Sequence, residues 1–217
     1  MSLAPIDRAR NLGGRKPDRA KDEAILQAAR ACFFERGFTA ATIEEIASRA
    51  EVSKVTIYKR FHDKESLFEA VVGSAMAEME RACEEGDNTG MLAERLVRFG
   101  VILLRFLFHP SHVSLDRMLA VEFMHMPELA RRFFEAGPAR SRARLAAMLD
   151  DAAQRGEIVI DDPLLAAADL LSLWLGFLEK ELKFGIVTEL ADAEIDRRVA
   201  RGTELFLRMT QVAWPGT

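Results

Sequence analysis

The chain has 217 residues, enough for one large domain or for a small domain joined to a larger one. Its 49% hydrophobic and 29% charged residues exclude a disordered chain, and its two cysteines favour a reducing cytoplasm over a disulfide framework. The net charge of −4 conceals a basic N-terminal quarter, because the first 64 residues hold 13 Lys+Arg against 9 Asp+Glu and the rest hold 17 against 25.

Helical periodicity runs through the chain, whereas runs of strict apolar–polar alternation are missing from the sequence, so we predict an all-α fold. Residues 1–18 are polar and basic and predict a flexible arm. A helix is expected from Arg19 to Arg36, with Ile25 and Cys32 on its apolar face, and Gly37 is a natural residue to end it.

Two short helices are predicted next. Thr42 and Glu45 form a capping box at the start of the first, and Ser53 is a plausible N-cap for the second. Asp63 then caps a longer helix that runs to about Glu85. Because isolated helices as short as the first two are unstable in water, packing must hold them rigidly, and such a pair predicts a helix-turn-helix.

The second short helix lies in the stretch "VSKVTIYKRF", which contains the only tyrosine of the chain, Tyr58. On a helix, Ile57 and Phe61 share one apolar stripe, and Val55, Tyr58 and Lys59 point the other way. A face with cations, a phenol and a small apolar group suits DNA phosphates and base edges. The alternative is an ordinary solvated surface.

The segment "ILQAARACFFERGFTAATIEEIASRAEVSKVTIYKRFHDKESLF" resembles the DNA-binding domain of the TetR family of bacterial repressors. The resemblance implies a DNA-binding domain over residues 19–65 that continues into a linking helix, residues 63–85. Glu51 and Val55 depart from the pattern, since the family often has glycine at both places; we expect Val55 to change which bases are read. The candidate DNA-binding residues are Thr42, Ser53, Lys54, Val55, Thr56, Tyr58, Lys59, Arg60 and Lys64.

In that set, the amides and hydroxyl at Thr42 suit a phosphate, as helix N-termini do. The resemblance assigns Tyr58 and Lys64 to further phosphates, and Arg60 is a fourth candidate. Lys54 and Lys59 are candidates for donating to guanine, and Val55 for packing on a thymine methyl group.

Residues 86–217 are predicted to form a larger, acidic helical domain. Helices are expected near residues 89–108, 112–125, 128–136, 139–155, 163–184 and 191–213. The stretch "AVEFMHMPELARRFFEAGPARSRARLAAMLDDAAQRGEI" resembles the ligand-binding and dimerisation domain of AefR-like members of the family.

This second resemblance implies a pocket for a small apolar effector. Its candidate lining residues are Phe99, Leu103, Phe106, Met118, Glu122, Phe123, Met126, Met148, Leu171, Trp174 and Phe177. For each of them, plain core packing is the alternative.

The last two predicted helices carry a candidate dimer interface. Its residues are Leu175, Gly176, Ile195, Val199, Gly202, Phe206, Met209 and Ala213, most of which recur at helical spacing along the final helix. The resembled family dimerises through a four-helix bundle of such helices. The alternative is that both helices are buried within one subunit.

We find no enzyme, metal or cofactor motif in the sequence; Glu122 and His125 are only half of a helical carboxylate–histidine site. No signal peptide is recognised, and the apolar run 164–178 is shorter than the roughly 20 residues that span a bilayer, so no membrane partner is expected. The sequence predicts a cytoplasmic homodimeric repressor that binds a palindromic double-stranded operator and is released by an effector. An activator with the same DNA-binding region, or a small-molecule-binding protein without DNA function, are the alternatives. The residues identify neither the effector, the operator nor the regulated genes.

Overall fold

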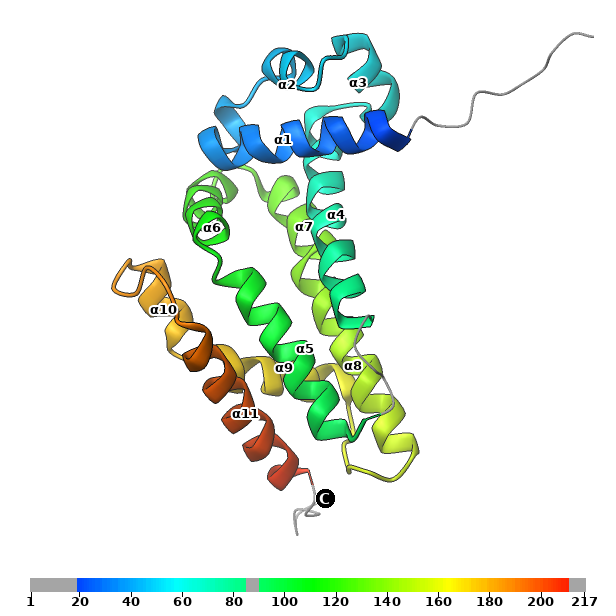
Figure 1. The fold of residues 1–217 in the computed structure, drawn as a ribbon, viewed down its shortest axis with the longest axis vertical. Helices are drawn as coiled ribbons and strands as arrows, with labels where there is room; N and C mark the ends of the chain where they lie inside the picture. The colour runs from blue at the N-terminus through cyan, green and yellow to red at the C-terminus, as the bar shows by residue number, and fades with distance from the viewer. Residues whose placement is uncertain (1–18, 85–89, 211–217) are drawn as a thin grey trace, which may run out of the picture.

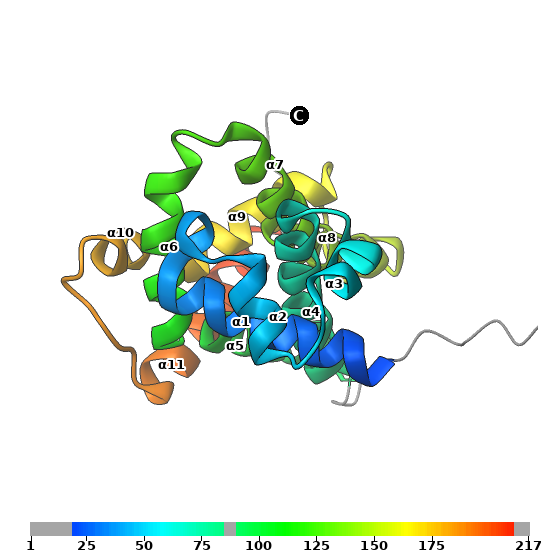
Figure 2. The ribbon, with the colours of Figure 1, turned by 90° about the horizontal axis from the view of Figure 1, so that it is seen from above.

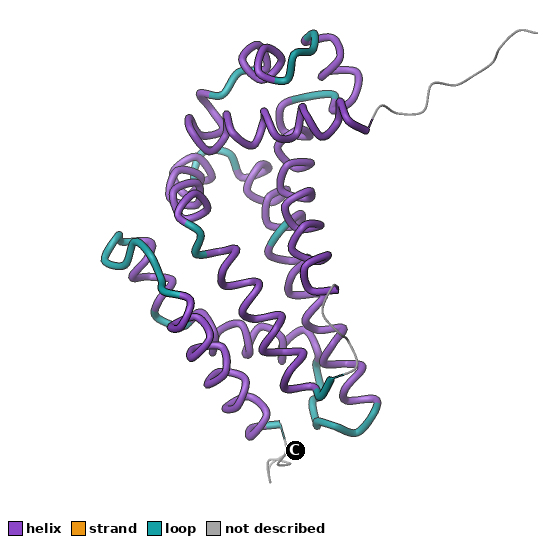
Figure 3. The backbone as a smooth tube through the Cα atoms, in the orientation of Figure 1, coloured by secondary structure: helices purple, strands orange, loops and turns teal. Residues whose placement is uncertain are grey.

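The computed structural model describes residues 19–84 and 90–210, in which eleven helices and no strand are found (Figures 1 and 3). The predicted all-α fold is confirmed. The helices are α1 (Arg19–Ala40), α2 (Ile43–Arg49), α3 (Lys54–Phe61), α4 (Lys64–Glu84), α5 (Leu92–Leu107), α6 (Pro110–Phe123), α7 (Pro127–Ala136), α8 (Pro138–Gln154), α9 (Pro163–Leu175), α10 (Leu178–Lys183) and α11 (Asp192–Met209). None of these helices has the length and apolar character needed to cross a membrane.

Helices α1–α3 form a head at one end of the elongated molecule, and α5–α11 form the body. Helix α1 lies across the end of the body, α2 and α3 lie on its outer side, and α4 runs from the head down along the body (Figures 1 and 2). The predicted basic arm, residues 1–18, lies outside the described residues.

The head and the body share a hydrophobic core. Ile25, Phe33 and Ile46 of the head are fully buried, and Leu119 from α6 and Leu129 from α7 belong to the same cluster. Because the body supplies part of the apolar packing, the orientation of the head depends on α6 and α7.

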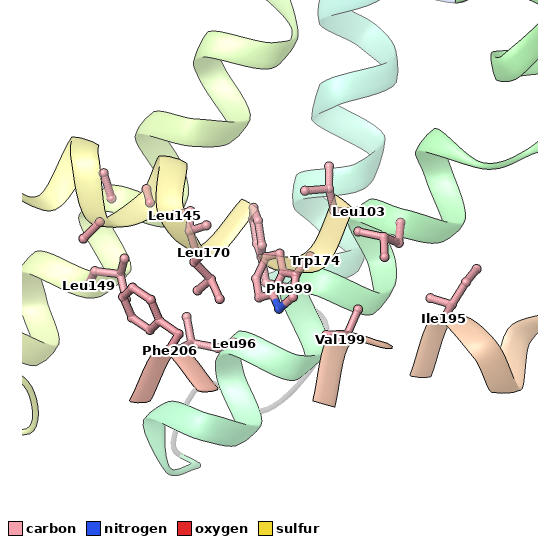
Figure 4. Packing of buried hydrophobic residues seen from close by; sticks show 14 of the residues in the cluster. Leu96, Phe99, Leu103, Leu145, Leu149, Leu170, Trp174, Ile195, Val199 and Phe206 are labelled. Atoms are coloured by element: carbon pink, nitrogen blue, oxygen red, sulfur yellow. The ribbon is translucent and has the colours of Figure 1, made fainter. Parts of the chain in front are cut away.

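The core of the body is formed by α5, α8, α9 and α11, whose side chains converge around Trp174 (Figure 4). The Trp174 indole Nε1 donates to Thr203 Oγ1 at 3.1 Å, so this buried polar pair is satisfied. A Cβ atom at Gly100 would lie 2.6 Å from Val199 Cγ1, and one at Gly202 would lie 2.7 Å from Trp174 Cδ1. Glycine at both positions therefore permits the close approach of these helices.

Two predicted helix boundaries are corrected, and both corrections involve glycine. Gly37 does not end α1 but kinks it, with φ 79° and ψ 175°, after which the chain turns once more to Ala40. The single helix predicted over residues 163–184 is broken at Gly176, where φ is 50°, into α9 and α10. With ψ of 175° at Gly37 and −138° at Gly176, both residues have φ/ψ combinations that are essentially restricted to glycine, so each glycine redirects the chain.

Candidate nucleic-acid interface and effector cavity

The two short helices of the head are capped at their N-termini by Thr42 and Ser53, as predicted. Of the predicted capping box only the Thr42 half is found, because the Glu45 carboxylate pairs with Arg49 and Arg36. Thr42 Oγ1 accepts a hydrogen bond from Glu45 N at 3.2 Å, and Ser53 Oγ accepts one from Thr56 N at 3.2 Å. Ile57 is 1% exposed in the head core. Helix α3 therefore has one fixed inner face, and its opposite face is directed outward.

The outward face of α3 carries the side chains that were predicted to contact DNA. Val55 is 60% exposed and Tyr58 is 50% exposed, and Lys54 and Lys59 are exposed beside them. Lys54 Nζ donates to Glu44 Oε1 on α2 at 2.6 Å. Both side chains of this pair are about half exposed or more, so Lys54 would exchange a weak surface partner for DNA at little cost.

Arg60 and Glu51 are placed less favourably for DNA contact. Arg60 is half-buried and pairs with Asp22 on α1, so its guanidinium ties α3 to α1. Glu51, in the turn between α2 and α3, has φ 54°, in the left-handed region that glycine prefers. The turn requires this conformation, and here a glutamate adopts it.

Lys64, which the resemblance assigned to a phosphate, is half-buried at the end of α1. Its Nζ lies 4.5 Å from the centre of the Phe38 ring, and burial lowers the pKa of its ammonium group. Lys64 Nζ donates to the backbone carbonyl oxygens of Phe38 (2.8 Å), Thr39 (3.2 Å) and Ala41 (2.9 Å). The ammonium group thus caps the C-terminal turn of α1.

Glu122 of α6 holds the same turn from the other side. Its carboxylate accepts hydrogen bonds from Phe38 N at 3.0 Å and from Thr39 N at 2.9 Å. The kink at Gly37 interrupts the regular helical geometry just before these two amides. We call the group formed by Lys64, Glu122 and residues 38–41 the joint.

The joint was not predicted from the sequence. Glu122 was assigned to the effector pocket, with its pair to His125 as half of a metal site. The acceptor and its two donors are more than 80 residues apart in the chain, so no local pattern reveals the contact. The one available signal is Gly37 inside an otherwise helical stretch, which frees amides that then need an acceptor.

A cavity of about 520 Å³ lies between the head, α4 and the body. Its wall is mostly apolar and aromatic, with Phe33 and Phe34 from α1, Phe68 from α4, and Phe106, Phe123 and Phe133 from the body. A molecule in this cavity would contact α1 directly.

The structure brings four of the predicted pocket residues to this cavity: Leu103, Phe106, Phe123 and Leu171. The others lie elsewhere. Trp174 and Phe99 are buried in the core of the body, Met148 lines a separate depression of about 270 Å³, Met126 packs on the head core, Phe177 is exposed, and Glu122 belongs to the joint. The side chain of Met118 is not among those described.

Polar groups are concentrated where α6 meets α10 at the cavity. Protein atoms surround the accessible Asp116 carboxyl on most sides, and this desolvation, with Glu179 nearby, raises its pKa to about 6. His112 lies between the rings of Phe34 and Phe106, where desolvation lowers its pKa to about 4. His112 is therefore neutral at pH 7.

Most residues predicted for the dimer interface are buried inside one chain. Ile195, Val199, Gly202 and Phe206 pack in the core of the body, where Phe206 is 2% exposed; Leu175 lines the cavity, Gly176 breaks the helix, Met209 is exposed, and Ala213 lies outside the described residues. Side chains that fill the core of one subunit are not available to a second subunit. Ile195, Val199, Gly202 and Phe206 are therefore core residues of one subunit, which is the alternative to the predicted dimer contact.

A capped pair of short helices that presents an exposed, basic outer face is a helix-turn-helix, and it defines a DNA-binding transcriptional regulator. The chain belongs to the TetR family of bacterial regulatory proteins. The family model for bacterial regulatory proteins of the tetR family matches residues 25–71, and that for the C-terminal domain of AefR-like transcriptional repressors matches residues 94–210.

Individual proteins agree with this assignment. The uncharacterized HTH-type transcriptional regulator YdeS of Bacillus subtilis is 30% identical over 149 residues, 67% of this chain and 71% of YdeS. A solved structure assigned to the TetR family, from Mesorhizobium loti MAFF303099, is 31% identical with a TM-score of 0.77, over 91% of this chain and 100% of that one. The flavonoid-responsive regulator FrrA is 32% identical with a TM-score of 0.72, over 91% of this chain and 98% of FrrA.

Proposed function

We propose that the protein is a homodimeric repressor that acts in the cytoplasm, binds a palindromic operator and is released from it by a small, mainly apolar effector. The observation that supports this most directly is the cavity, whose wall includes α1 and α4 as well as the body. An effector there would contact the DNA-binding head itself.

On DNA, each subunit would place α3 in a major groove, with the two half-sites about one helical turn, roughly 34–36 Å, or slightly more apart. Lys54, Val55 and Lys59 would face base edges, and the exposed Tyr58 and the amino end of α2 at Thr42 would contact phosphates. Because Lys64 and Arg60 already hold α1 in place, we assign them to positioning the head.

The joint offers a route from the cavity to the head. Phe123 lines the cavity, and the neighbouring residue Glu122 holds the backbone of residues 38–39. An effector that shifts the end of α6 would move α1. This movement would change the distance between the α3 helices of the two subunits. It weakens DNA binding only as far as it binds the shifted conformation more tightly.

For the dimer contact we propose the outer faces of α9 and α11, the helices that the family resemblance assigns to dimerisation. Leu165 on α9, and Leu205 and Met209 on α11, are apolar and exposed. Asp169 and Arg201 on the same faces are exposed and opposite in charge, which suits a self-complementary two-fold contact.

FrrA is described as flavonoid-responsive, and it resembles this chain over nearly its whole length. We therefore propose that the effector of this protein is a planar aromatic molecule of similar size. Drug-sized pockets measure roughly 300–1,000 Å³, so a cavity of about 520 Å³ is large enough for such a molecule.

Two measurements test the proposed function. Selection of bound fragments from random DNA should recover a palindrome, and a Val55→Gly variant should recover one with a changed base pair in each half-site. Fluorescence anisotropy on the selected DNA should then show release when flavones are added. A folded protein that selects no sequence would refute the DNA-binding role; retention of DNA at saturating ligand would refute the effector role.

A further inference from the structure

Asp116 is a polar group of the cavity with unused hydrogen-bonding capacity. Within residues 19–84 and 90–210 its carboxyl group forms no hydrogen bond and no ion pair. Its neighbour Arg117, by contrast, donates through Nε to the carbonyl oxygen of Leu182 at 3.1 Å. The carboxyl group is accessible from the empty cavity, and a ligand that fills the cavity would displace its water, so the ligand must supply a hydrogen-bond donor in its place.

The charges around Asp116 come from three helices. Arg117 and the neutral His112 are on α6 itself, Glu179 and Lys183 are on α10, and Arg30 lines the same cavity from α1. Asp116 and Glu179 disfavour an anionic ligand, whereas the three cations disfavour a cationic one. The lining therefore favours an uncharged ligand that brings its own donor.

The aromatic side chains in the rest of the cavity wall favour a ligand with aromatic rings. Phe34 and Phe106 lie close to His112 at this part of the cavity, and Phe33 and Phe68 line the wall formed by α1 and α4. Aromatic rings pack well against such a wall in offset and edge-on arrangements.

We propose that the effector is a neutral aromatic molecule with a hydroxyl group that donates a hydrogen bond to the carboxylate of Asp116. This inference rests on the proposed function, because it concerns the same cavity. It adds that the aromatic effector is neutral and carries a hydroxyl donor, and it names the residue that selects this donor. At pH 7 the carboxyl group is mostly ionised, since its pKa is about 6, so it is an acceptor for a phenolic hydroxyl.

The test uses flavone, monohydroxyflavones substituted on either ring system, and the methyl ether of each hydroxyflavone. A methyl ether keeps the size and the oxygen but removes the donor. Binding is measured by calorimetry at pH 7 for the full chain, for Asp116→Leu, for the nearly isosteric Asp116→Asn, and for the control Asp161→Leu, which removes an exposed carboxylate outside the cavity wall.

We expect at least one hydroxyflavone to bind about ten- to a hundredfold more tightly than its methyl ether, as for a hydrogen bond to a charged group. This preference should vanish in Asp116→Leu, shrink in Asp116→Asn and persist in Asp161→Leu. Both Asp116 variants should keep the helical circular dichroism of the parent, because within the described residues the carboxyl group forms no hydrogen bond or ion pair that the substitution would break.

Equal binding of hydroxyflavones and ethers, or a preference that survives in Asp116→Leu, overturns the assignment of Asp116. If the ethers also release the selected DNA in that case, the proposed effector site stands without this residue. If none of the compounds binds while the protein still binds DNA, both the ligand class and the flavone-sized effector are refuted, and the DNA-binding role remains.

Discussion

Replacing Glu122 by glutamine tests whether the joint transmits the effector signal. The glutamate accepts two hydrogen bonds, from Phe38 N at 3.0 Å and Thr39 N at 2.9 Å. A glutamine has one oxygen for these two donors, so one amide faces an NH₂ group and loses its acceptor. Hydrogen bonds to charged groups are worth about 1.5–3 kcal/mol, so Glu122→Gln should weaken the joint by about 2 kcal/mol.

Allosteric coupling between two sites usually amounts to about 1–3 kcal/mol, so a loss of this size should remove most of it. We expect Glu122→Gln to bind the effector normally in the absence of DNA. Saturating effector should, however, lower its operator affinity by a much smaller factor than it does for the parent. The assay measures operator affinity by anisotropy with and without saturating effector. Effector affinity with and without DNA must change by the same factor, because coupling is reciprocal.

Glu135→Gln on α7 is the matched control. That glutamate also accepts hydrogen bonds, from Arg131, but the pair is exposed and joins two residues of one helix. The control should show parental coupling. An unchanged release factor in Glu122→Gln, with both affinities intact, would show that the signal reaches the head by another route.

Three further perturbations probe the head, the dimer and the cavity. Lys59→Ala should weaken operator binding and lower the salt dependence by about one unit without changing the melting temperature, whereas Lys64→Ala should lower the melting temperature because it uncaps α1; equal melting temperatures would return Lys64 to the DNA surface. Leu205→Glu, 39% exposed on α11, should split the dimer in sedimentation while the protein stays folded, and Val121→Glu, an exposed position on α6, should leave it intact; a dimeric Leu205→Glu protein would move the contact elsewhere. His112 has a pKa near 4 in the folded protein against about 6.5 when unfolded, so its contribution to stability is present above pH 6.5 and is lost as the pH falls towards 4. Between pH 7 and pH 5, the free energy of unfolding from urea titrations should fall by about 2 kcal/mol more for the parent than for His112→Gln. Equal losses in the two proteins would refute this.

The features that were predictable from the sequence are those that depend on neighbouring residues. Thr42 and Ser53 cap helices whose amides are three residues away, and the turn of the helix fixes that geometry. The exposed face of α3 follows from the same periodicity, because Ile57 fixes the face that points inward.

Contacts between distant segments were not predictable. Periodicity indicated that one stripe of α11 is buried, but it does not say which helices cover the stripe, and Phe206 is covered by its own subunit. Lys64 matched a DNA-contacting position of the family, yet its ammonium group donates to three backbone carbonyl oxygens of residues 38–41, at the end of α1 and just beyond it. Asp116 lies in a part of the sequence without any motif and gains interest only from the helices around it.

The core shared by the head with Leu119 and Leu129 limits how this protein can be recombined. A fragment with α1–α4 alone would leave an uncovered apolar surface where α6 and α7 now lie. The head would therefore be poorly fixed if it were fused to the body of another protein. Chimaeras that carry new operator specificity should therefore keep the native partners of α1, including α6. The region that reads DNA is contiguous in sequence, but the unit that can be exchanged is not.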